Sequence, residues 1–172
     1  TTGVVLTIAA SHVVFENMTI QGSGVDAVPP TSWGFQITGA RTNVTVRDCN
    51  VTGVDYGISQ SVPGGSGGHQ TGALVYGNIL VGNNLWSGAF IDPATNNITW
   101  DDDGINLAGF GICVFGNTVS GFGDAFGWNQ SLNLGLYRAE GIYIYRNYVP
   151  FTCDDAIEAD YAPVYGGYAL DQ

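Results

Sequence analysis

The chain of 172 residues carries 15 Asp and Glu against 4 Lys and Arg, which gives a formal net charge of −11 at pH 7. All of its basic residues are arginines and they form no cluster, so the sequence excludes nucleic acid as the main partner. With 45% hydrophobic residues the chain can still build a core, and its length predicts a single domain over residues 1–172.

The first predicted strand covers residues 4–8, directly after Thr1, Thr2 and Gly3. No signal-peptide pattern precedes it, so we expect a mature protein, a fragment of a longer chain or one unit of an assembly. The longest uncharged run, residues 56–91, is interrupted by Gln, Ser, Pro and Gly, which argues against a membrane-spanning helix.

Five segments then share one pattern, in which apolar residues alternate and the segment ends in Asn or Asp. They cover residues 13–17, 44–48, 74–78, 113–117 and 143–147. The pattern recurs about every 30 residues, except where an insertion over residues 92–103 lengthens one step.

A second element follows each Asn or Asp, at residues 34–35, 55–58, 88–90, 124–126 and 155–157. A third covers residues 103–107 and 140–144. Short strand-like pieces at this period, with glycine turns and no helical periodicity, predict an all-β solenoid of about five coils with parallel strand pairing.

The segment Asn43-Val44-Thr45-Val46-Arg47-Asp48, the recurring Asn, and Thr152-Cys153-Asp154-Asp155-Ala156-Ile157-Glu158 resemble the pectin-lyase-like superfamily. The resemblance covers about residues 4–161 and implies a right-handed parallel β-helix. That fold hosts lyases, hydrolases, epimerases, tailspikes and adhesins, so the resemblance leaves the function open.

The recurring Asn or Asp is interpreted as a ladder of stacked side chains at one corner of each coil. The ladder comprises Asn17, Asp48, Asn78, Asn117 and Asn147. Such side chains satisfy backbone groups that the turn would leave without partners.

Two columns precede this ladder, and adjacent strand positions face opposite sides. One column comprises Phe15, Val46, Tyr76, Phe115 and Tyr145, and the other Val14, Thr45, Val75, Val114 and Ile144. An apolar stripe therefore faces outward, where loops of the chain, another subunit or sugar rings could cover it.

The acidic residues are predicted to fall into columns as well. Asp55, Asp124 and Asp155 take equivalent places in their coils, Asp103 shares another place with Glu140, and the last coil is the most acidic. Three interpretations are open: a calcium site, a carboxylate pair at a glycosidic bond, or solvated turn residues.

The catalytic candidates are Asp124, Asp154, Asp155, Glu158 and Arg138, and the substrate-binding candidates are Tyr143, Tyr145 and Trp128. The superfamily's lyases bridge a uronate with calcium and use an Arg or Lys base, and of the polygalacturonase motifs only Asp154-Asp155 is present. The acidic loop Asp101-Asp102-Asp103 is a candidate for weak Ca²⁺ binding, but its spacing does not match an EF-hand. No other cofactor is indicated.

Glycosylation triplets begin at Asn17, Asn43, Asn50, Asn97 and Asn129, which favours a secreted or cell-surface protein. The cysteines Cys49, Cys113 and Cys153 allow one disulfide or three thiols. Two functions are therefore carried forward. The first is an extracellular carbohydrate-active or carbohydrate-binding domain with a polysaccharide as partner, and the second is a non-catalytic module of a filament, spike or other assembly that self-associates through the apolar stripe.

Overall fold

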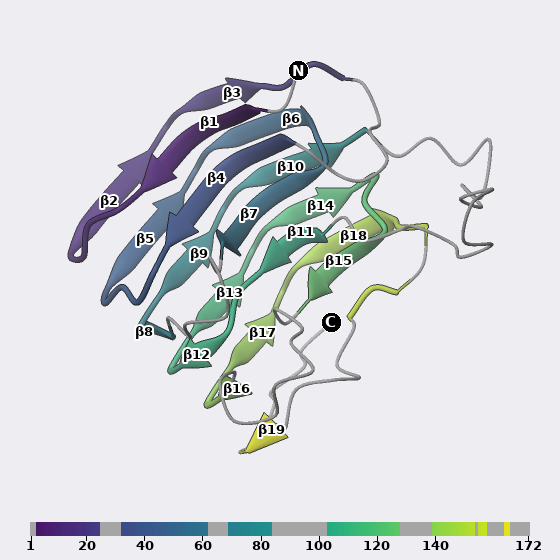
Figure 1. The fold of residues 1–172 in the computed structure, drawn as a ribbon. Helices are drawn as coiled ribbons and strands as arrows, with labels where there is room; N and C mark the ends of the chain where they lie inside the picture. The colour runs from purple at the N-terminus through teal and green to yellow at the C-terminus, as the bar shows by residue number, and fades with distance from the viewer. Residues whose placement is uncertain are drawn as a thin grey trace, which may run out of the picture.

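The computed structural model describes residues 3–24, 32–61, 69–83, 103–127, 139–153, 155–157 and 164–165. These residues form only strands, turns and loops, and every strand pairing among them is parallel (Figure 1). The prediction of an all-β chain with parallel strand pairing is confirmed, in an arrangement compatible with a parallel β-helix.

The strands belong to four sheets, which we call A, B, C and D. Sheet A contains β1 (Gly3–Ile8), β4 (Ser32–Thr38), β7 (Tyr56–Ser61), β11 (Asp103–Asn106) and β15 (Asp124–Gly127). Sheet B contains β2 (Val13–Glu16), β5 (Val44–Arg47), β9 (Leu74–Tyr76), β13 (Cys113–Phe115) and β17 (Tyr143–Tyr145). Sheet C contains β3 (Thr19–Gln21), β6 (Asn50–Val54), β10 (Ile79–Gly82), β14 (Thr118–Ser120) and β18 (Tyr148–Phe151). Sheet D contains β8 (Gln70–Thr71), β12 (Gly109–Phe110), β16 (Ala139–Glu140) and β19 (Val164–Tyr165).

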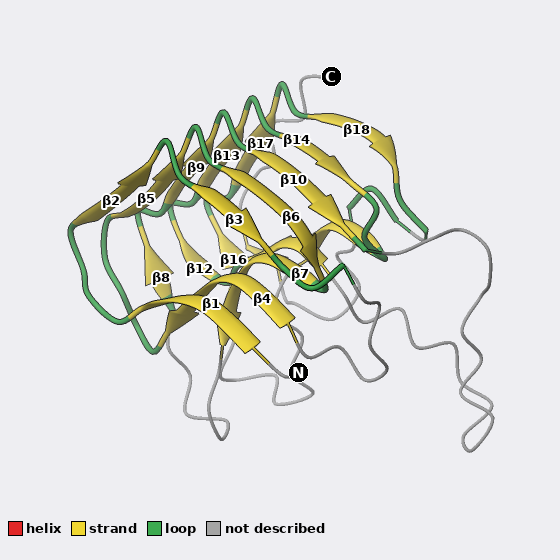
Figure 2. Ribbon diagram, turned by 90° about the horizontal axis from the view of Figure 1, so that it is seen from above, coloured by secondary structure: helices red, strands yellow, loops and turns green. Residues whose placement is uncertain are grey.

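The chain visits these sheets in a repeating order. It passes from sheet A to B to C twice, and from β7 onward it passes through sheet D between A and B. The turns that join sheets B and C therefore line up in a row, one above another (Figure 2). Such an order requires each strand to pair with its equivalents from the preceding and following passes, because neighbouring strands of one pass lie in different sheets.

The core is built from columns of apolar side chains that stack from one pass to the next. One column comprises Ile20, Val51, Leu80 and Val119 from sheet C, another Val46, Val75, Val114 and Ile144 from sheet B, and a third Phe35, Ile58, Ile105 and Phe126 from sheet A. All of these side chains are buried. Alternating Val, Thr and Ile in short strands suits this layout, because β-branched residues pack well on a half-buried pleated surface.

The predicted ladder is wrong in its first two members. Asn17 and Asp48 lie at a left-handed turn position with φ of 56° and 53°, where Gly77, Gly116 and Arg146 follow in the later passes. The inward position comes one residue later and is occupied by Met18, Cys49, Asn78, Asn117 and Asn147. Asn and Asp tolerate left-handed backbone, so the same residue type serves two adjacent columns.

The true ladder consists of Asn78, Asn117 and Asn147. Asn78 Oδ1 accepts the Cys49 N–H at 3.0 Å, and its Nδ2 donates to Val46 O at 3.0 Å and to Asn117 Oδ1 at 2.9 Å. Asn117 Oδ1 also accepts the Asn78 N–H at 3.0 Å. Both amides are 1% exposed, so the structural role expected for the ladder is confirmed for these residues.

The shift also changes which column faces outward. The inward column of sheet B is Phe15, Val46, Val75, Val114 and Ile144, and one outward column is Glu16, Arg47, Tyr76, Phe115 and Tyr145. The other outward column is Val14, Thr45, Leu74, Cys113 and Tyr143. The two predicted columns therefore mixed both faces, because the pass from Asp48 to Gly77 is one residue shorter than the pattern suggested.

Candidate functional site

One column on sheet A combines aromatic and acidic side chains. Trp33 pairs with Tyr56, and Asp103 pairs with Asp124. The pairing of Ile58 with Ile105 places Tyr56 beside Asp103, and the bridge between Phe126 and Ile157 places Asp124 beside Asp155. We call Trp33, Tyr56, Asp103, Asp124 and Asp155 the sheet A column.

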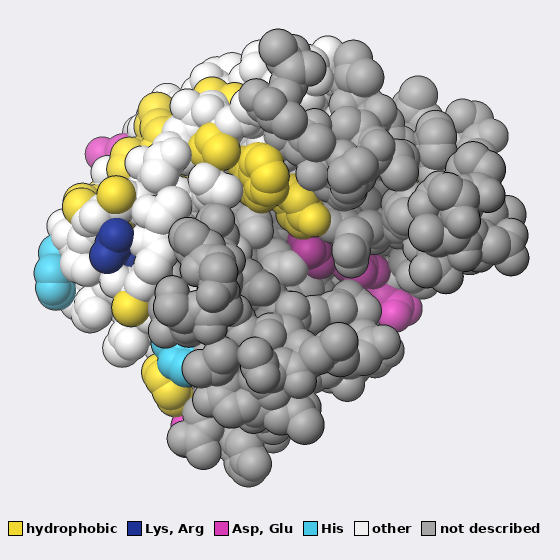
Figure 3. Space-filling model, in the orientation of Figure 1, with side chains coloured by type: hydrophobic (Ala, Val, Ile, Leu, Met, Phe, Trp, Pro, Cys, Tyr) yellow, Lys and Arg dark blue, Asp and Glu magenta, His cyan; other side chains and the backbone are white. Residues whose placement is uncertain are grey.

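The sheet A column points away from the core because the next residue in each strand points into it. A Cβ added to Gly34 would lie 2.5 Å from the core atom Val51 Cγ1, and one added to Gly104 would lie 2.3 Å from Val119 Cγ1. The residue before an inward residue of a strand faces the opposite side, so Trp33 and Asp103 face outward. Phe35 and Ile105 are buried in the core as well, so the alternation is interrupted at the glycine. Figure 3 shows this face, on which a row of hydrophobic side chains leads into a group of acidic ones.

The aromatic end of the column is a stacked pair. The rings of Trp33 and Tyr56 lie 5.4 Å apart between centroids, with 9° between their planes. Both side chains are half-buried. Because the two rings cover one another's faces, the pair presents mainly apolar ring edges beside the first carboxylate of the column.

The acidic end is held by hydrogen bonds. Asp124 Oδ1 accepts the N–H of Asp155 at 2.9 Å, and Asp103 Oδ2 accepts Asn106 Nδ2 at 2.5 Å. Asp103 and Asp124 are each 7% exposed, whereas Asp155 is exposed. A Cβ added to Gly127 would lie 2.1 Å from Asp103 Oδ1 and 3.3 Å from Asn106 Nδ2, so both side chains lie over this glycine.

Asp55 does not belong to the sheet A column, contrary to the prediction. It precedes Tyr56 and is 1% exposed. Its Oδ2 accepts the backbone N–H of Ser32 at 2.8 Å and the Ser32 hydroxyl at 2.9 Å, and its Oδ1 accepts Asn83 Nδ2 at 2.9 Å. Asp55 therefore fixes the entry of the chain into sheet A.

The predicted equivalence of Asp103 and Glu140 is also wrong. Asp103 belongs to sheet A, whereas Glu140 belongs to sheet D and pairs with Phe110. Three residues of the column, Trp33, Tyr56 and Asp103, were not predicted to join Asp124. A signal for them exists in the sequence, since each is followed by a glycine and then by a large apolar residue that enters the core.

The structure brings two of the predicted catalytic residues together, Asp124 and Asp155. Asp154, Glu158 and Arg138, the predicted substrate-binding Trp128, and Asp101 and Asp102 of the predicted calcium loop lie outside the described residues. Tyr143 and Tyr145 lie on sheet B and not on sheet A. Among the predicted glycosylation sites, Asn17, Asn43 and Asn50 are exposed, whereas Asn97 and Asn129 lie outside the described residues.

Sheet B carries a second aromatic row, on its outward face. The ring of Phe115 stacks on Tyr76 at 4.8 Å and on Tyr145 at 5.0 Å, with 6° and 4° between the planes. Arg47 lies over Tyr76, 6.0 Å from the ring centroid, donates to its hydroxyl at 2.8 Å and also pairs with Glu16. The rings cover one another's faces, so this row presents mainly ring edges outward.

Within the described part of the chain, no three His, Cys, Asp or Glu side chains gather in a group that could hold a metal ion. Cys49, Cys113 and Cys153 form no disulfide bond. No helix formed by the residues that the structure describes could span a membrane.

Comparison with protein-family models, with curated proteins and with solved structures finds no match for this chain.

Proposed function

We propose that the stacked sheets form a right-handed parallel β-helix of the pectin-lyase-like type. The repeating order of sheets A, D, B and C supports this fold, as does the stacking of equivalent residues in every pass. The left-handed turn column supports it further, because it recurs in all five passes, as does the buried amide ladder, which recurs in the last three.

We propose that this chain is an extracellular carbohydrate-active or carbohydrate-binding domain that takes a polysaccharide along sheet A. The observation that carries the proposal is the sheet A column, in which Trp33 and Tyr56 are followed in register by Asp103, Asp124 and Asp155. A linear polymer lying across the strands would meet the aromatic pair and then the carboxylates.

Glycoside hydrolysis uses a carboxyl pair, and the column offers two kinds of pair. Neighbouring strands lie about 4.8 Å apart, so Asp103 and Asp124 start near the separation of about 5 to 5.5 Å typical of retaining enzymes. Asp103 and Asp155 are two strands apart, close to the upper end of the range of about 6.5 to 9.5 Å typical of inverting enzymes. Cation-assisted β-elimination is the other catalytic route, in which Arg138 would be the base and Ca²⁺ would neutralise the charge of a uronate.

The test is turnover and binding of a panel of soluble polysaccharides by the purified chain. Asp103→Asn should reduce kcat at least about 100-fold if either pair is catalytic, since general acid–base catalysis contributes this much. Asp124→Asn should do the same for the retaining pair, and Asp155→Asn for the inverting pair. Asp48→Asn is the matched control, because it removes the same charge at an exposed turn between sheets B and C. Unchanged turnover and binding in all three sheet A variants would rule out the proposal.

A second function, a non-catalytic module of a filament, spike or other surface assembly, is favoured by a different observation. Large apolar side chains are exposed on the outward faces of sheets B and C, namely Val14, Leu74, Tyr143, Ile79, Val81 and Tyr148. Surfaces of this kind often mark protein contacts. Sedimentation equilibrium tests it, and a monomer at every concentration would count against assembly.

A further inference from the structure

The substrate class of the proposed site follows from its hydrogen-bonding character. Asp103, Asp124 and Asp155 are carboxylate acceptors in one column, and Asn106 adds an amide to the same face. We call these four residues the acceptor strip. We propose that the strip selects a neutral polysaccharide, whose hydroxyls donate to it, and rejects polyuronates; this rests on the proposed function of sheet A.

Asn106 provides the first argument. Its Nδ2 donates to Asp103 Oδ2, which fixes the orientation of the amide because the oxygen would be repelled by the carboxylate. The other polar atom of the amide is therefore Oδ1, and it is buried without a hydrogen-bond partner in the structure. The residue is 9% exposed. A buried acceptor without a donor is costly, so this atom indicates a ligand that donates a hydrogen bond.

Gly127 shows that the two groups share one surface. A Cβ at this position would contact both Asp103 Oδ1 and Asn106 Nδ2. The side chains of Asp103 and Asn106 therefore lie over the backbone of β15, the strand that begins with Asp124. A donor that reaches Asn106 Oδ1 also approaches the carboxylate of Asp103. A sugar hydroxyl can take this place, whereas a uronate carboxylate has no hydrogen to donate at neutral pH.

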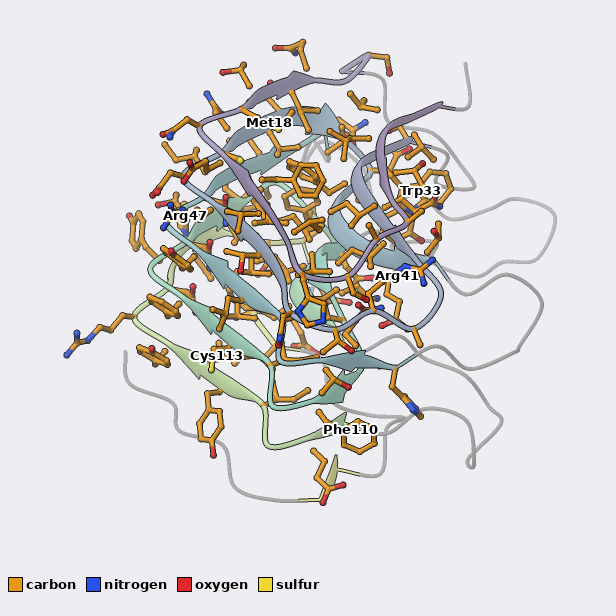
Figure 4. The ribbon with its side chains drawn as sticks, turned by 90° about the vertical axis from the view of Figure 1, so that its left-hand side faces the viewer. Met18, Trp33, Arg41, Arg47, Phe110 and Cys113 are labelled. Atoms are coloured by element: carbon orange, nitrogen blue, oxygen red, sulfur yellow. The ribbon has the colours of Figure 1, made fainter. Side chains whose placement is uncertain are left out.

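The distribution of basic residues provides the second argument. The chain has four arginines and no lysine. Arg47 pairs with Glu16 on sheet B, on the opposite side from Trp33 (Figure 4). Arg41 follows the far end of β4, where it donates to Ala40 O, and Arg146 occupies the turn after β17.

Neither histidine belongs to sheet A. His12 lies at the turn before β2, where its Nδ1 contacts Asn43, and His69 packs against Phe110 of sheet D. Arg138 is the one basic side chain outside the described residues, and a single arginine balances at most one of the three carboxylates. A polyanion along the column would therefore meet net negative charge, which is unfavourable wherever water is excluded.

The aromatic pair fits the same ligand. Trp33 and Tyr56 continue the column beyond Asp103, where their stacked rings present mainly apolar ring edges. The faces of a neutral sugar ring are rich in C–H groups, so they bury well against such surface, whereas a charged carboxylate loses hydration there. A polymer lying across the strands then meets acceptors at one end of the column and aromatic rings at the other.

The experiment is binding of the purified chain to a neutral β-glucan and a galactomannan, and to polygalacturonate and alginate, by calorimetry with Ca²⁺ or with EDTA. At least one neutral polysaccharide should bind at least tenfold more tightly than either polyuronate, with Ca²⁺ or with EDTA. If a polyuronate binds as tightly as the best neutral polysaccharide, with or without Ca²⁺, the inference is overturned and the proposed function stands. No binding to any polysaccharide would overturn both.

A variant with fewer carboxylates tests whether electrostatic repulsion or the shape of the site causes the preference for neutral polysaccharide. The double variant Asp124→Asn, Asp155→Asn keeps side-chain size and acceptor oxygens, and it should narrow the preference for neutral polysaccharide by about tenfold. Asp48→Asn, which removes charge away from sheet A, should leave the preference unchanged. Equal effects of the control and the double variant would show that the net charge of the molecule, and not the strip, sets the preference.

Discussion

The two asparagine columns can be separated by making one substitution at two positions. Asn17 and Asn117 occupy the same place in the sequence pattern, but Asn17 is exposed at a left-handed turn and Asn117 is buried in the ladder. We expect Asn117→Gly to destabilise the protein strongly and Asn17→Gly to have little effect. Because both changes are Asn to Gly, their effects on the unfolded chain are the same and cancel in the comparison.

The magnitude follows from the hydrogen bonds of Asn117. Removing its side chain leaves the Asn78 N–H without the Oδ1 that it donates to at 3.0 Å, and Val75 O without the Nδ2 that it accepts at 3.0 Å. Each buried group left without a partner costs about 1–3 kcal/mol, so Asn117→Gly should lose about 4 kcal/mol of unfolding free energy. At position 17, Gly relieves the left-handed backbone, so the change should stay within about 0.5 kcal/mol.

The assay is equilibrium unfolding in urea, followed by both circular dichroism and tryptophan fluorescence. The midpoint should fall sharply for Asn117→Gly at an unchanged slope, and it should stay near the wild-type value for Asn17→Gly. Equal losses at the two positions would refute the register, since they would place both residues in one ladder. A loss below about 1 kcal/mol for Asn117→Gly would refute the hydrogen-bond accounting.

Three further predictions concern the packing of the core and the burial of the cysteine thiols. Gly57→Ala should destabilise by about 2 kcal/mol in the same unfolding assay, because its Cβ would lie 2.3 Å from Gly104 O. Leu80→Ala removes a fully buried side chain and should cost about 2–5 kcal/mol, again by urea midpoint. Burial raises the pKa of the Cys49 and Cys113 thiols, so both should be alkylated more slowly at pH 8 than in the unfolded chain, with the gap closing as the pH rises.

The strands and their parallel pairing could be predicted from the sequence because each follows from local chemistry. In β5 the apolar residues Val44 and Val46 alternate with Thr45 and Arg47, and a residue that tolerates left-handed backbone follows the strand. The register could not be predicted as reliably. Asn occurs at the turn in one pass and at the inward position in another, so counting by residue type aligned Asn17 with Asn78 and shifted the later columns by one residue.

The candidate site shows the same limit. Asp124 and Asp155 were placed together because both precede an alanine and a large apolar residue. Asp55 was grouped with them because it is acidic and precedes a similar segment, but Tyr56 takes the outward place there. Asp103 was assigned both to the insertion over residues 92–103 and to the strand-like piece over residues 103–107. That piece was matched to residues 140–144 and not to the segment that begins at Asp124, with which it pairs.

The small inward residue that follows each member of the sheet A column is a signal for this column in the sequence. Gly34, Gly57 and Gly104 approach the next strand so closely that a Cβ would contact its carbonyl oxygen, at 2.7, 2.3 and 2.7 Å respectively. The close approach of the strands therefore requires a small residue at this position, which places the preceding residue in the outward column. The choice of Trp, Tyr or Asp at that preceding position is free of this constraint, because those side chains face away from the core. An outward column that changes from aromatic to acidic along one face is thus better explained by what binds there than by packing.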